Sequence, residues 1–247
     1  MNKTKRIVAF MLLAVIGLSC FTGCDVINGL INPTPDSGSG NENETGSGKT
    51  YTFEAEGIDF SGLTSFGYSI NISETEMILG EHSNVPENVV KSASNGCFVG
   101  YFNPQGENGL TLTFVINADK ASEENTMTLR LATEYGTMTI TPDDMDVTVN
   151  GTALQYDAIT VVGENLTSVS QWHGYVVPFN DYKLSAKFAL KEGENVITLK
   201  IKANELGFAD DVMLKSVGPG IDCIKIRSES NLTWESLWED NKAELGI

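Results

Sequence analysis

The chain has 247 residues, with 33 acidic and 16 basic side chains and a formal net charge of −17. This charge excludes a nucleic-acid-binding protein that depends on a broad basic surface. Only 2 histidines occur, too few for a zinc site built from several imidazoles. Because 41% of the residues are hydrophobic, the chain can bury a sizeable core, and we expect one folded domain with terminal extensions.

The N-terminus has the pattern of a secretory signal peptide. A basic head precedes an apolar run over residues 7–18, which is short for a membrane-spanning helix. The stretch Phe21-Thr22-Gly23-Cys24 resembles a bacterial lipobox, in which small residues precede a Cys that becomes lipidated. We therefore predict a signal peptide over residues 1–23 and an extracytoplasmic protein anchored to the membrane by a lipidated Cys24. Cys20 is the alternative lipidation site, and an ordinary cleaved signal is the alternative to both.

Residues 24–50 predict a flexible linker between the lipidated Cys and the folded domain. Pro33 and Pro35 precede a stretch of Gly, Ser and other polar residues over residues 37–48. Gly/Ser-rich chains behave as random coils, so such a tether holds a domain clear of a lipid surface.

From residue 51 onward, apolar residues alternate with a period of two, which indicates strands. Clear examples are residues 110–116, 126–132, 145–149 and 195–201. Turn sequences such as Asn150-Gly151 separate the runs. Since no strands alternate with long helices, we predict an all-β fold, a β-sandwich over residues 51–228.

The C-terminal residues 229–247 carry a helical pattern. Thr233 fits an N-cap, and Trp234, Leu237, Trp238 and Leu245 would lie near one helical face. We expect this short helix to cover an open end of the sandwich, because two tryptophans are seldom left exposed. The alternative is a helix that binds a protein partner.

Two acidic residues open the folded region. Residues two apart in a strand share a face, so Glu54 and Glu56 would point the same way. Solvent, a proton or a cation between them would relieve their repulsion, and oxygen ligands without His or Cys favour Ca²⁺. A third anionic group from elsewhere in the chain would favour the metal.

Five stretches follow one another in an order typical of a known family. They are residues 53–56 (FEAE), 94–102 (SNGCFVGYF), 147–153 (VTVNGTA), 190–199 (LKEGENVITL) and 221–226 (IDCIKI). In this order they resemble carbohydrate-binding modules of the family 6 and family 35 type, which implies a jelly-roll sandwich. In those modules the first and last strands lie side by side, and their acidic residues hold a structural calcium ion. The resemblance implies that Glu54, Glu56 and Asp222 bind Ca²⁺, although residues 141–146 and 156–183 are longer than the family pattern.

Members of that family bind sugar mainly in a cleft formed by loops at one end of the sandwich. An exposed Trp flanked by hydrogen-bonding residues suits a sugar, which has an apolar C–H face and polar hydroxyls. Trp172 has an alternative role as the buried anchor of a long loop, and Tyr101 as a core residue. The ligand-binding residues that we predict are Trp172, Tyr175, His173, Asn180 and Tyr101.

Cys97 and Cys223 remain after lipidation, and the sequence leaves open whether they form a disulfide or stay as thiols. The function that we predict is non-catalytic carbohydrate binding by a lipid-anchored surface protein with a calcium-stabilised jelly roll. One alternative is an adhesin or scaffold component that binds a protein partner. A second is a jelly-roll glycoside hydrolase or lyase, for which Glu54 and Glu56 would supply the carboxylate pair.

Overall fold

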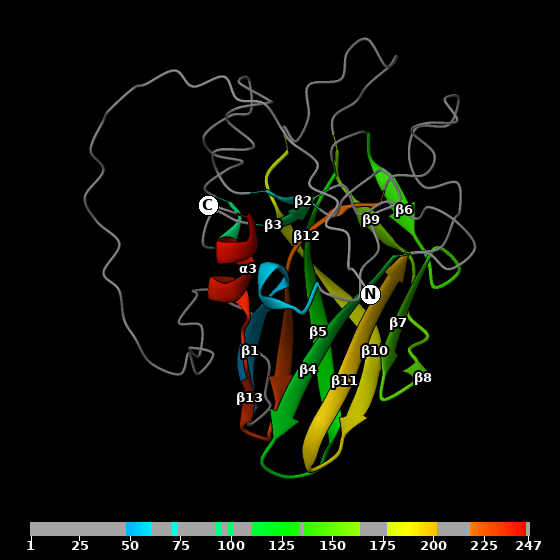
Figure 1. Ribbon diagram of the computed structural model, residues 1–247. Coiled ribbons are helices and arrows are strands. Elements are labelled where there is room, and N and C mark those ends of the chain that lie inside the picture. Colours follow the sequence, from blue (N-terminus) through cyan, green and yellow to red (C-terminus); the bar gives the residue numbers. More distant parts are fainter. Residues whose placement is uncertain are drawn as a thin grey trace, which may run out of the picture. The chain divides into compact units, whose positions relative to one another are not determined.

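The computed structural model describes residues 48–60, 71–73, 92–94, 98–100, 110–133, 136–163, 177–201 and 218–245 (Figure 1). Within these residues strands predominate, as the sequence predicts. The strands are β1 (Lys49–Glu54), β2 (Asn71–Ser73), β3 (Phe98–Gly100), β4 (Leu110–Ala118), β5 (Ser122–Ala132), β6 (Met138–Ile140), β7 (Met145–Val149), β8 (Thr152–Ala153), β9 (Ile159–Val161), β10 (Asn180–Leu190), β11 (Gly193–Ile201), β12 (Gly220–Ser228) and β13 (Leu232–Trp234). The helices are η1, a 3-10 turn over Ala55–Gly57, and α3 (Trp238–Leu245).

The strands form two antiparallel sheets that pack face to face. The first sheet has the order β10–β5–β12–β3–β2, and β1 pairs with β12 on the same side as β3. The second sheet has the order β13–β4–β11–β7–β8, and β6 and β9 form a separate short pair. This arrangement confirms the all-β prediction of a jelly-roll β-sandwich.

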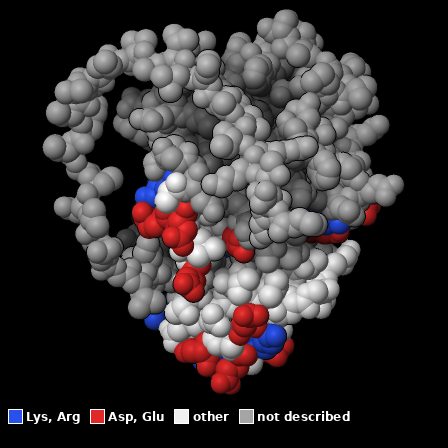
Figure 2. All heavy atoms as spheres, viewed as in Figure 1, with Lys and Arg blue, Asp and Glu red and all other residues white. Residues whose placement is uncertain are grey.

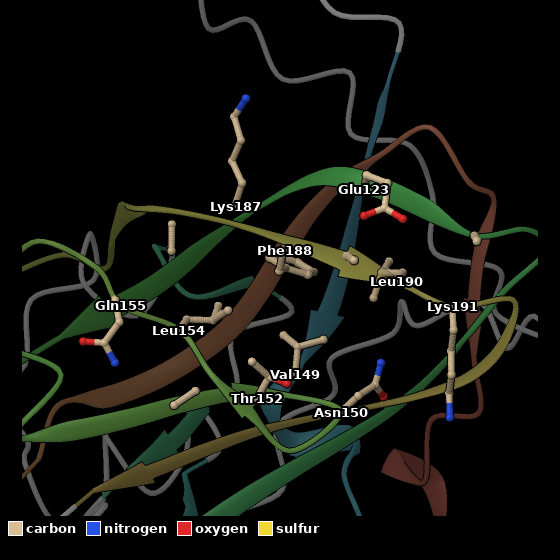
Figure 3. A pocket seen from close by; sticks show the side chains of 14 residues that line it. Glu123, Val149, Asn150, Thr152, Leu154, Gln155, Lys187, Phe188, Leu190 and Lys191 are labelled. Atoms are coloured by element: carbon tan, nitrogen blue, oxygen red, sulfur yellow. The ribbon is translucent and has the colours of Figure 1, made fainter.

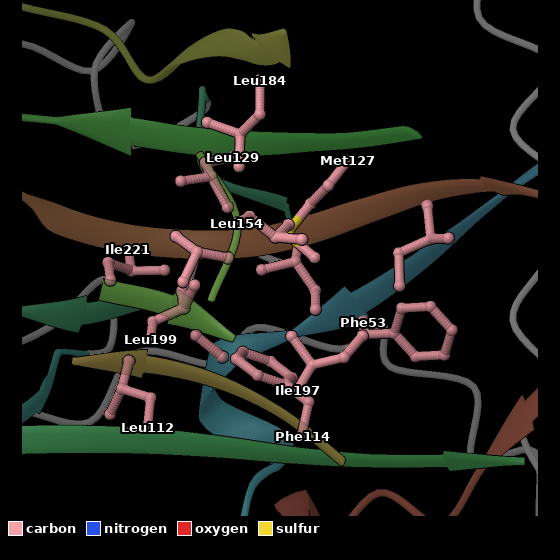
Figure 4. Packing of buried hydrophobic residues seen from close by; sticks show 14 of the residues in the cluster. Phe53, Leu112, Phe114, Met127, Leu129, Leu154, Leu184, Ile197, Leu199 and Ile221 are labelled. Carbon is pink, nitrogen blue, oxygen red and sulfur yellow. The ribbon is translucent and has the colours of Figure 1, made fainter. Parts of the chain in front are cut away.

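The core lies between the two sheets because every second strand residue is apolar. Met127 and Leu129 of β5 are fully buried, and so are Ile197 and Leu199 of β11 in the opposite sheet. Figure 4 shows these side chains packed against one another between the sheets. Full burial of one such side chain contributes about 1.5–3 kcal/mol, so the two layers form a stable scaffold for loops at their ends.

The predicted turn at Asn150-Gly151 joins β7 to β8. Both residues have positive φ angles, 51° and 78°, as a two-residue hairpin turn of type I′ requires. The turn sets the register in which Val149 lies opposite Thr152.

The first strand lies beside β12, far along the chain. The pairing runs from Lys49 opposite Ser228 to Glu54 opposite Cys223. Phe53 is fully buried in the core, so Glu54, its neighbour on the strand, lies on the outer face of the first sheet. The family resemblance implied this meeting of the two ends of the domain.

The C-terminal segment differs from the prediction. Leu232–Trp234 forms strand β13, which pairs with β4, and the helix begins at Trp238 instead of Thr233. Thr233 is therefore a strand residue and not an N-cap. Burial of Leu232, and of Trp234 against Phe53 at 5.6 Å between ring centroids, outweighs the local helical pattern.

The helix α3 does cover part of the sandwich. The Asn241 side chain donates hydrogen bonds from Nδ2 to the backbone oxygens of Glu56 and Ile58, at 2.8 and 2.9 Å. Gly57 is approached so closely that a Cβ there would lie 2.4 Å from Ser236 Oγ and 2.6 Å from Trp234 Cη2. Strand β13 and α3 therefore close over the turn that follows β1.

Acidic side chains gather at the end of the sandwich that carries the hairpin turns and near α3, and uncharged surface separates them in Figure 2. No helix in the described part of the chain combines the length and apolar character needed to cross a bilayer. The predicted signal peptide, Cys24, the alternative Cys20 and the tether up to residue 47 lie outside the described residues.

Candidate functional site

A cluster of polar side chains lies on the outer face of the first sheet, where β1 meets β12. The Ser94 hydroxyl lies 2.7 Å from Glu54 Oε2 and 2.8 Å from Asp222 Oδ1. The Ser94 backbone N–H also donates to both carboxylate oxygens of Asp222, at 3.0 Å each. Two acidic residues from opposite ends of the domain therefore share one serine.

An irregularity in β12 turns Asp222 toward this cluster. In the pairing with β5, Ile221 lies opposite Leu131 and Cys223 lies opposite Arg130, so Asp222 is the extra residue of a β-bulge. The Asp222 side chain is 0% exposed, although it lies in a strand whose apolar neighbours fill the core. The bulge allows a buried carboxylate to be paired without leaving the sheet.

The environment disfavours two ionised carboxylates. The pKa of Glu54 is raised to about 7, mainly by burial, which outweighs the opposing hydrogen bond from Ser94; the nearby Asp222 adds to the rise. Burial also raises the pKa of Asp222 to about 6. One hydroxyl carries one proton and can donate to only one of the two carboxylates. Arg130 and Lys225 offset part of this penalty, and near neutral pH a proton or a bound cation would relieve the rest.

Arg130 connects the cluster to the beginning of β10. Its Nε lies 2.9 Å from Asp222 Oδ2, and its Nη1 lies 2.8 Å from Asp181 Oδ1. The Nε also donates to the backbone oxygen of Ser92 at 3.1 Å, and Ser92 Oγ accepts from the Phe179 N–H at 2.8 Å. Phe179 and Asp181 are thereby fixed to the same network as Asp222.

The cluster suits an oxygen-preferring cation. Glu54, Asp222 and Ser94 supply oxygen atoms, which are the ligands that Ca²⁺ takes in proteins. The Cys223 Sγ lies within 4.8 Å of the carboxylate oxygens of Glu54 and Asp222. Burial raises the pKa of the Cys223 thiol well above its ordinary value, so the sulfur stays protonated and is a poor metal ligand at neutral pH. The residues present therefore fit Ca²⁺ better than a thiophilic metal.

Glu56 does not share a strand face with Glu54, contrary to the sequence-based expectation. Strand β1 ends at Glu54 and η1 begins at Ala55, so the two-residue alternation stops between the two acidic residues. The Glu56 side chain is 1% exposed and is not part of the group of close ligand atoms that Glu54, Asp222 and Cys223 form.

Of the residues predicted to bind sugar, Asn180 lies in the described part of the chain. It is the first residue of β10, its side chain is exposed, and its Nδ2 donates to the backbone oxygen of Pro178 at 2.9 Å. Its neighbour Phe179 is buried, with its ring 4.7 Å from that of Phe98. Outside the described residues lie Trp172, His173, Tyr175 and Tyr101.

The structure describes one of the two cysteines that were candidates for a disulfide. Cys223 is a free, fully buried thiol, and Cys97 lies outside the described residues.

Ser94 and Arg130 belong to the cluster although no sequence motif marks them as functional residues. Arg130 is the one basic residue in the alternating run of residues 126–132, at a position that faces away from the core. A charge on a strand with neighbours on both sides needs partners, and that signal could have marked Arg130. Ser94 lies in an irregular segment, so no periodic pattern distinguishes it.

No protein-family model and no curated protein matches the chain. Its fold is similar to a family 35 carbohydrate-binding module from Paenibacillus barcinonensis, with 16% identity, a TM-score of 0.39, and coverage of 71% of this chain and 96% of that one. A family 35 module from an environmental isolate is 15% identical, with a TM-score of 0.39 and coverage of 75% and 98%. A family 35 module from Clostridium thermocellum is 22% identical, with a TM-score of 0.33 and coverage of 53% and 76%. The solved structures that this chain resembles thus include several family 35 carbohydrate-binding modules.

Proposed function

We propose that this protein binds carbohydrate without catalysis, through loops at one end of a calcium-stabilised jelly roll. The observation that carries the proposal is the convergence of Glu54 and Asp222 on the Ser94 hydroxyl. The motifs in the sequence that resemble family 6 and family 35 modules imply this meeting of the first and last strands. Without such a common role, two acidic residues that are far apart in the chain would have to be buried side by side by chance.

A calcium ion would bind beside Glu54 and Asp222, with Ser94 as a further oxygen ligand. It would take the place of a bound proton and would tie the end of β1 to β12. Asp222 is already oriented by Arg130 and by the Ser94 N–H, so little reorganisation is needed for binding.

The predicted sugar site lies at the end of the sandwich where β10 begins. The Arg130 network holds Phe179 and Asp181 directly after the segment that carries Trp172, His173 and Tyr175. Asn180, between the two held residues, has an exposed amide that can donate to and accept from sugar hydroxyls. A rigid strand end of this kind positions loop residues for recognition.

The acidic residues do not suit glycoside hydrolysis. Retaining catalysis needs two carboxylates about 5–5.5 Å apart in an open cleft. Glu56 is 1% exposed and Asp222 is 0% exposed, so neither carboxylate reaches a glycosidic bond. These burial values support a binding protein over a hydrolase that uses these residues.

We also propose that the protein lies outside the cytoplasm, anchored by a diacylated Cys24 and a flexible tether. Two acyl chains are needed for stable anchoring, because each buried methylene contributes only about 0.8 kcal/mol. Metabolic labelling with a fatty-acid analogue should label the intact chain and not a Cys24→Ala variant.

A glycan array probed with and without Ca²⁺ tests the binding function. We expect the protein to bind a defined set of glycans and EDTA to weaken this binding. The affinity should fall by more than tenfold in Trp172→Ala and in Asn180→Ala. Asn117→Ala is the matched control, because Asn117 is an exposed amide of β4 on the second sheet. An empty array, or release of reducing ends from a polysaccharide by the purified protein, would contradict the proposal.

A further inference from the structure

A groove of about 760 Å³ runs along the side of the sandwich, between the β7–β8 hairpin of the second sheet and the last residues of β10 in the first. Figure 3 shows Val149, Leu154, Phe188 and Leu190 in the middle of this groove, with polar side chains around them. Its volume is within the range of roughly 300–1,000 Å³ that is usual for ligand sites. All of its lining residues belong to the described part of the chain.

The groove is separate from the predicted sugar site. Strand β10 begins at Asn180 and ends at Leu190, and Leu190 lines the groove. The lining residue of β10 nearest to Asn180 is Ala186, and six steps at the rise of a strand separate these two by about 20 Å. One small ligand cannot contact both places, whereas a polysaccharide can.

The rim of the groove carries groups that suit sugar hydroxyls. Glu123 offers an acceptor, Lys191 a donor, and Gln155 and Thr152 both kinds of group. Within the described residues, none of these four side chains is used in a hydrogen bond or an ion pair of the fold. A sugar hydroxyl both donates and accepts, so a mixed rim of this kind matches it better than a rim of one charge sign.

Two other polar residues of the groove are already engaged. Asn150 donates from Nδ2 to Asn195 Oδ1 at 2.8 Å and accepts from the Val196 N–H at 3.0 Å. Lys187 forms an ion pair with Glu124. The charged side chains of the rim that stay available are the Glu123 carboxylate and the Lys191 ammonium. Their charges balance, which favours a neutral ligand over a polyanion.

A peptide that adds a strand to the sheet fits the groove poorly. The pairing of β10 with β5 is irregular between Lys183 and Lys187 and again between Phe188 and Leu190. Bulges and lysines on an edge strand are features that prevent further strand pairing. Strand β8, on the other wall, has only 2 residues. Recognition here must therefore come from side chains and from the apolar floor.

We propose that this groove is a second carbohydrate-binding subsite, which takes a neutral segment of the same polysaccharide that the loops bind. Apolar C–H groups of the sugar would lie over the alanines of the groove and the small exposed part of Phe188, and hydroxyls would meet Glu123, Gln155 and Lys191. This inference rests on the proposed function. Two sites on one chain raise the local concentration of the second segment once the first has bound, so long polymers bind more tightly than short ones.

Affinity electrophoresis of the complete mature chain in gels that contain galactomannan, xylan or mixed-linkage β-glucan tests this inference. The groove variant is Gln155→Ala/Lys191→Ala, and the control is Asn117→Ala/Lys200→Ala, on the outer face of the second sheet. We expect the groove variant to bind the retarding polysaccharide about tenfold more weakly, as the loss of two hydrogen-bonding groups predicts, and the control to match the wild type. Residual retardation of Trp172→Ala should disappear when the groove variant is added to it.

The remaining outcomes overturn the inference in distinguishable ways. Equal retardation of the wild type and the groove variant overturns the second subsite and leaves the proposed function intact. Absence of retardation by all three polysaccharides overturns the subsite, and a blank glycan array in addition overturns the proposed function. A dimer in sedimentation velocity that the groove variant loses identifies a second copy of the chain as the occupant instead.

Discussion

The Ser94 hydroxyl can donate its one proton to either Glu54 or Asp222, but not to both at once. This hydroxyl is within hydrogen-bonding distance of both carboxylates, and the Ser94 N–H is already given to Asp222. Asp222 also has Arg130 at 2.9 Å, so Asp222 is better stabilised as an anion than Glu54 is. In the absence of a metal, Glu54 is therefore the carboxyl that binds a proton first as the pH falls.

Removal of one candidate ligand should abolish the response to calcium. At a hundredfold excess over Kd, a cation bound only by the native state stabilises it by about 2.7 kcal/mol, which raises the Tm of a domain of this size by roughly 5–10 °C. We expect Glu54→Gln to lose this increment, because the amide keeps the hydrogen bond to Ser94 but is a weaker ligand. Asp157→Asn, at an exposed position, is the control that should keep it. Differential scanning calorimetry with CaCl₂ and with EDTA measures the difference, and equal melts in the wild type count against the site.

The raised pKa values predict the pH dependence of the metal-free protein. A carboxyl whose pKa is raised on folding binds more protons in the native state, so its favourable contribution is complete below the unfolded pKa and disappears as the pH rises through the folded one. The pKa is raised to about 7 for Glu54 and to about 6 for Asp222. With EDTA, we expect this contribution to be lost between about pH 4 and pH 7, as a fall in Tm across that range.

Calcium should reverse that trend, because it competes with protons for the same oxygens. The Tm increment produced by CaCl₂ should therefore be larger at pH 8 than at pH 5. An increment that is independent of pH would show that the ion binds elsewhere.

At the scale of the elements, the long strands could be predicted because every second side chain faces the same hydrophobic core, which produces a regular apolar alternation in the sequence. Residues 110–116 and 195–201, for example, lie inside β4 and β11. The helix at Thr233 could not be excluded from sequence, since local spacing does not reveal that β4 has a free edge for Leu232–Trp234. Glu56 was misplaced for a similar reason: the chain turns at Ala55, where the strand pattern has no visible break.

The candidate site was predicted only in part. Glu54 and Asp222 could be paired through the family resemblance, but Ser94 and Arg130 could not, because the register of β5 against β12 and its bulge are not encoded in any short motif.

The two C-terminal tryptophans should differ in their effect on stability. Trp234 packs against Phe53, with ring centroids 5.6 Å apart, and Phe114, at 6.3 Å. Trp238 contributes less. The Lys242 ammonium lies over its ring, 5.4 Å from the ring centroid. We expect Trp234→Ala to lower the free energy of unfolding by about 3 kcal/mol and Trp238→Ala by less than about 1 kcal/mol. Urea denaturation measures both values. A large loss in Trp238→Ala with none in Trp234→Ala would contradict the packing.

At the scale of the whole molecule, the two ends of β1 have different surroundings. The row across the first sheet at Glu54 contains Cys223, Arg130 and Asp181, next to the start of β10. The row at the other end contains Lys49 and Ser228, and Ser228 Oγ lies 3.3 Å from Ser122 Oγ, beside the end of β10. The chain therefore enters the sandwich at the end opposite Asn180 and the start of β10.

The folded domain should not need the residues before Gly48. Gly48 packs on Ser228, where a Cβ would lie 2.9 Å from the backbone oxygen, and β1 begins at Lys49. We expect a chain of residues 48–247 to melt within about 1 °C of one that begins at Asp25, because a Gly/Ser-rich linker, as the sequence predicts here, contributes no buried surface. Parallel calorimetry of the two chains checks this. A Tm lower by several degrees in the shorter chain would assign a structural role to the linker.

Because β1 begins at the end of the sandwich opposite the start of β10, its direction determines how the protein would carry mechanical load. If the N-terminus is held at a membrane and a polysaccharide is held at the other end, tension acts along β1, away from the sugar. The hydrogen bonds between β1 and β12 lie across that direction. All six residue pairs are then sheared together instead of being peeled apart one at a time, and an ion at Glu54 would fasten the strand at the far end of the sheared interface.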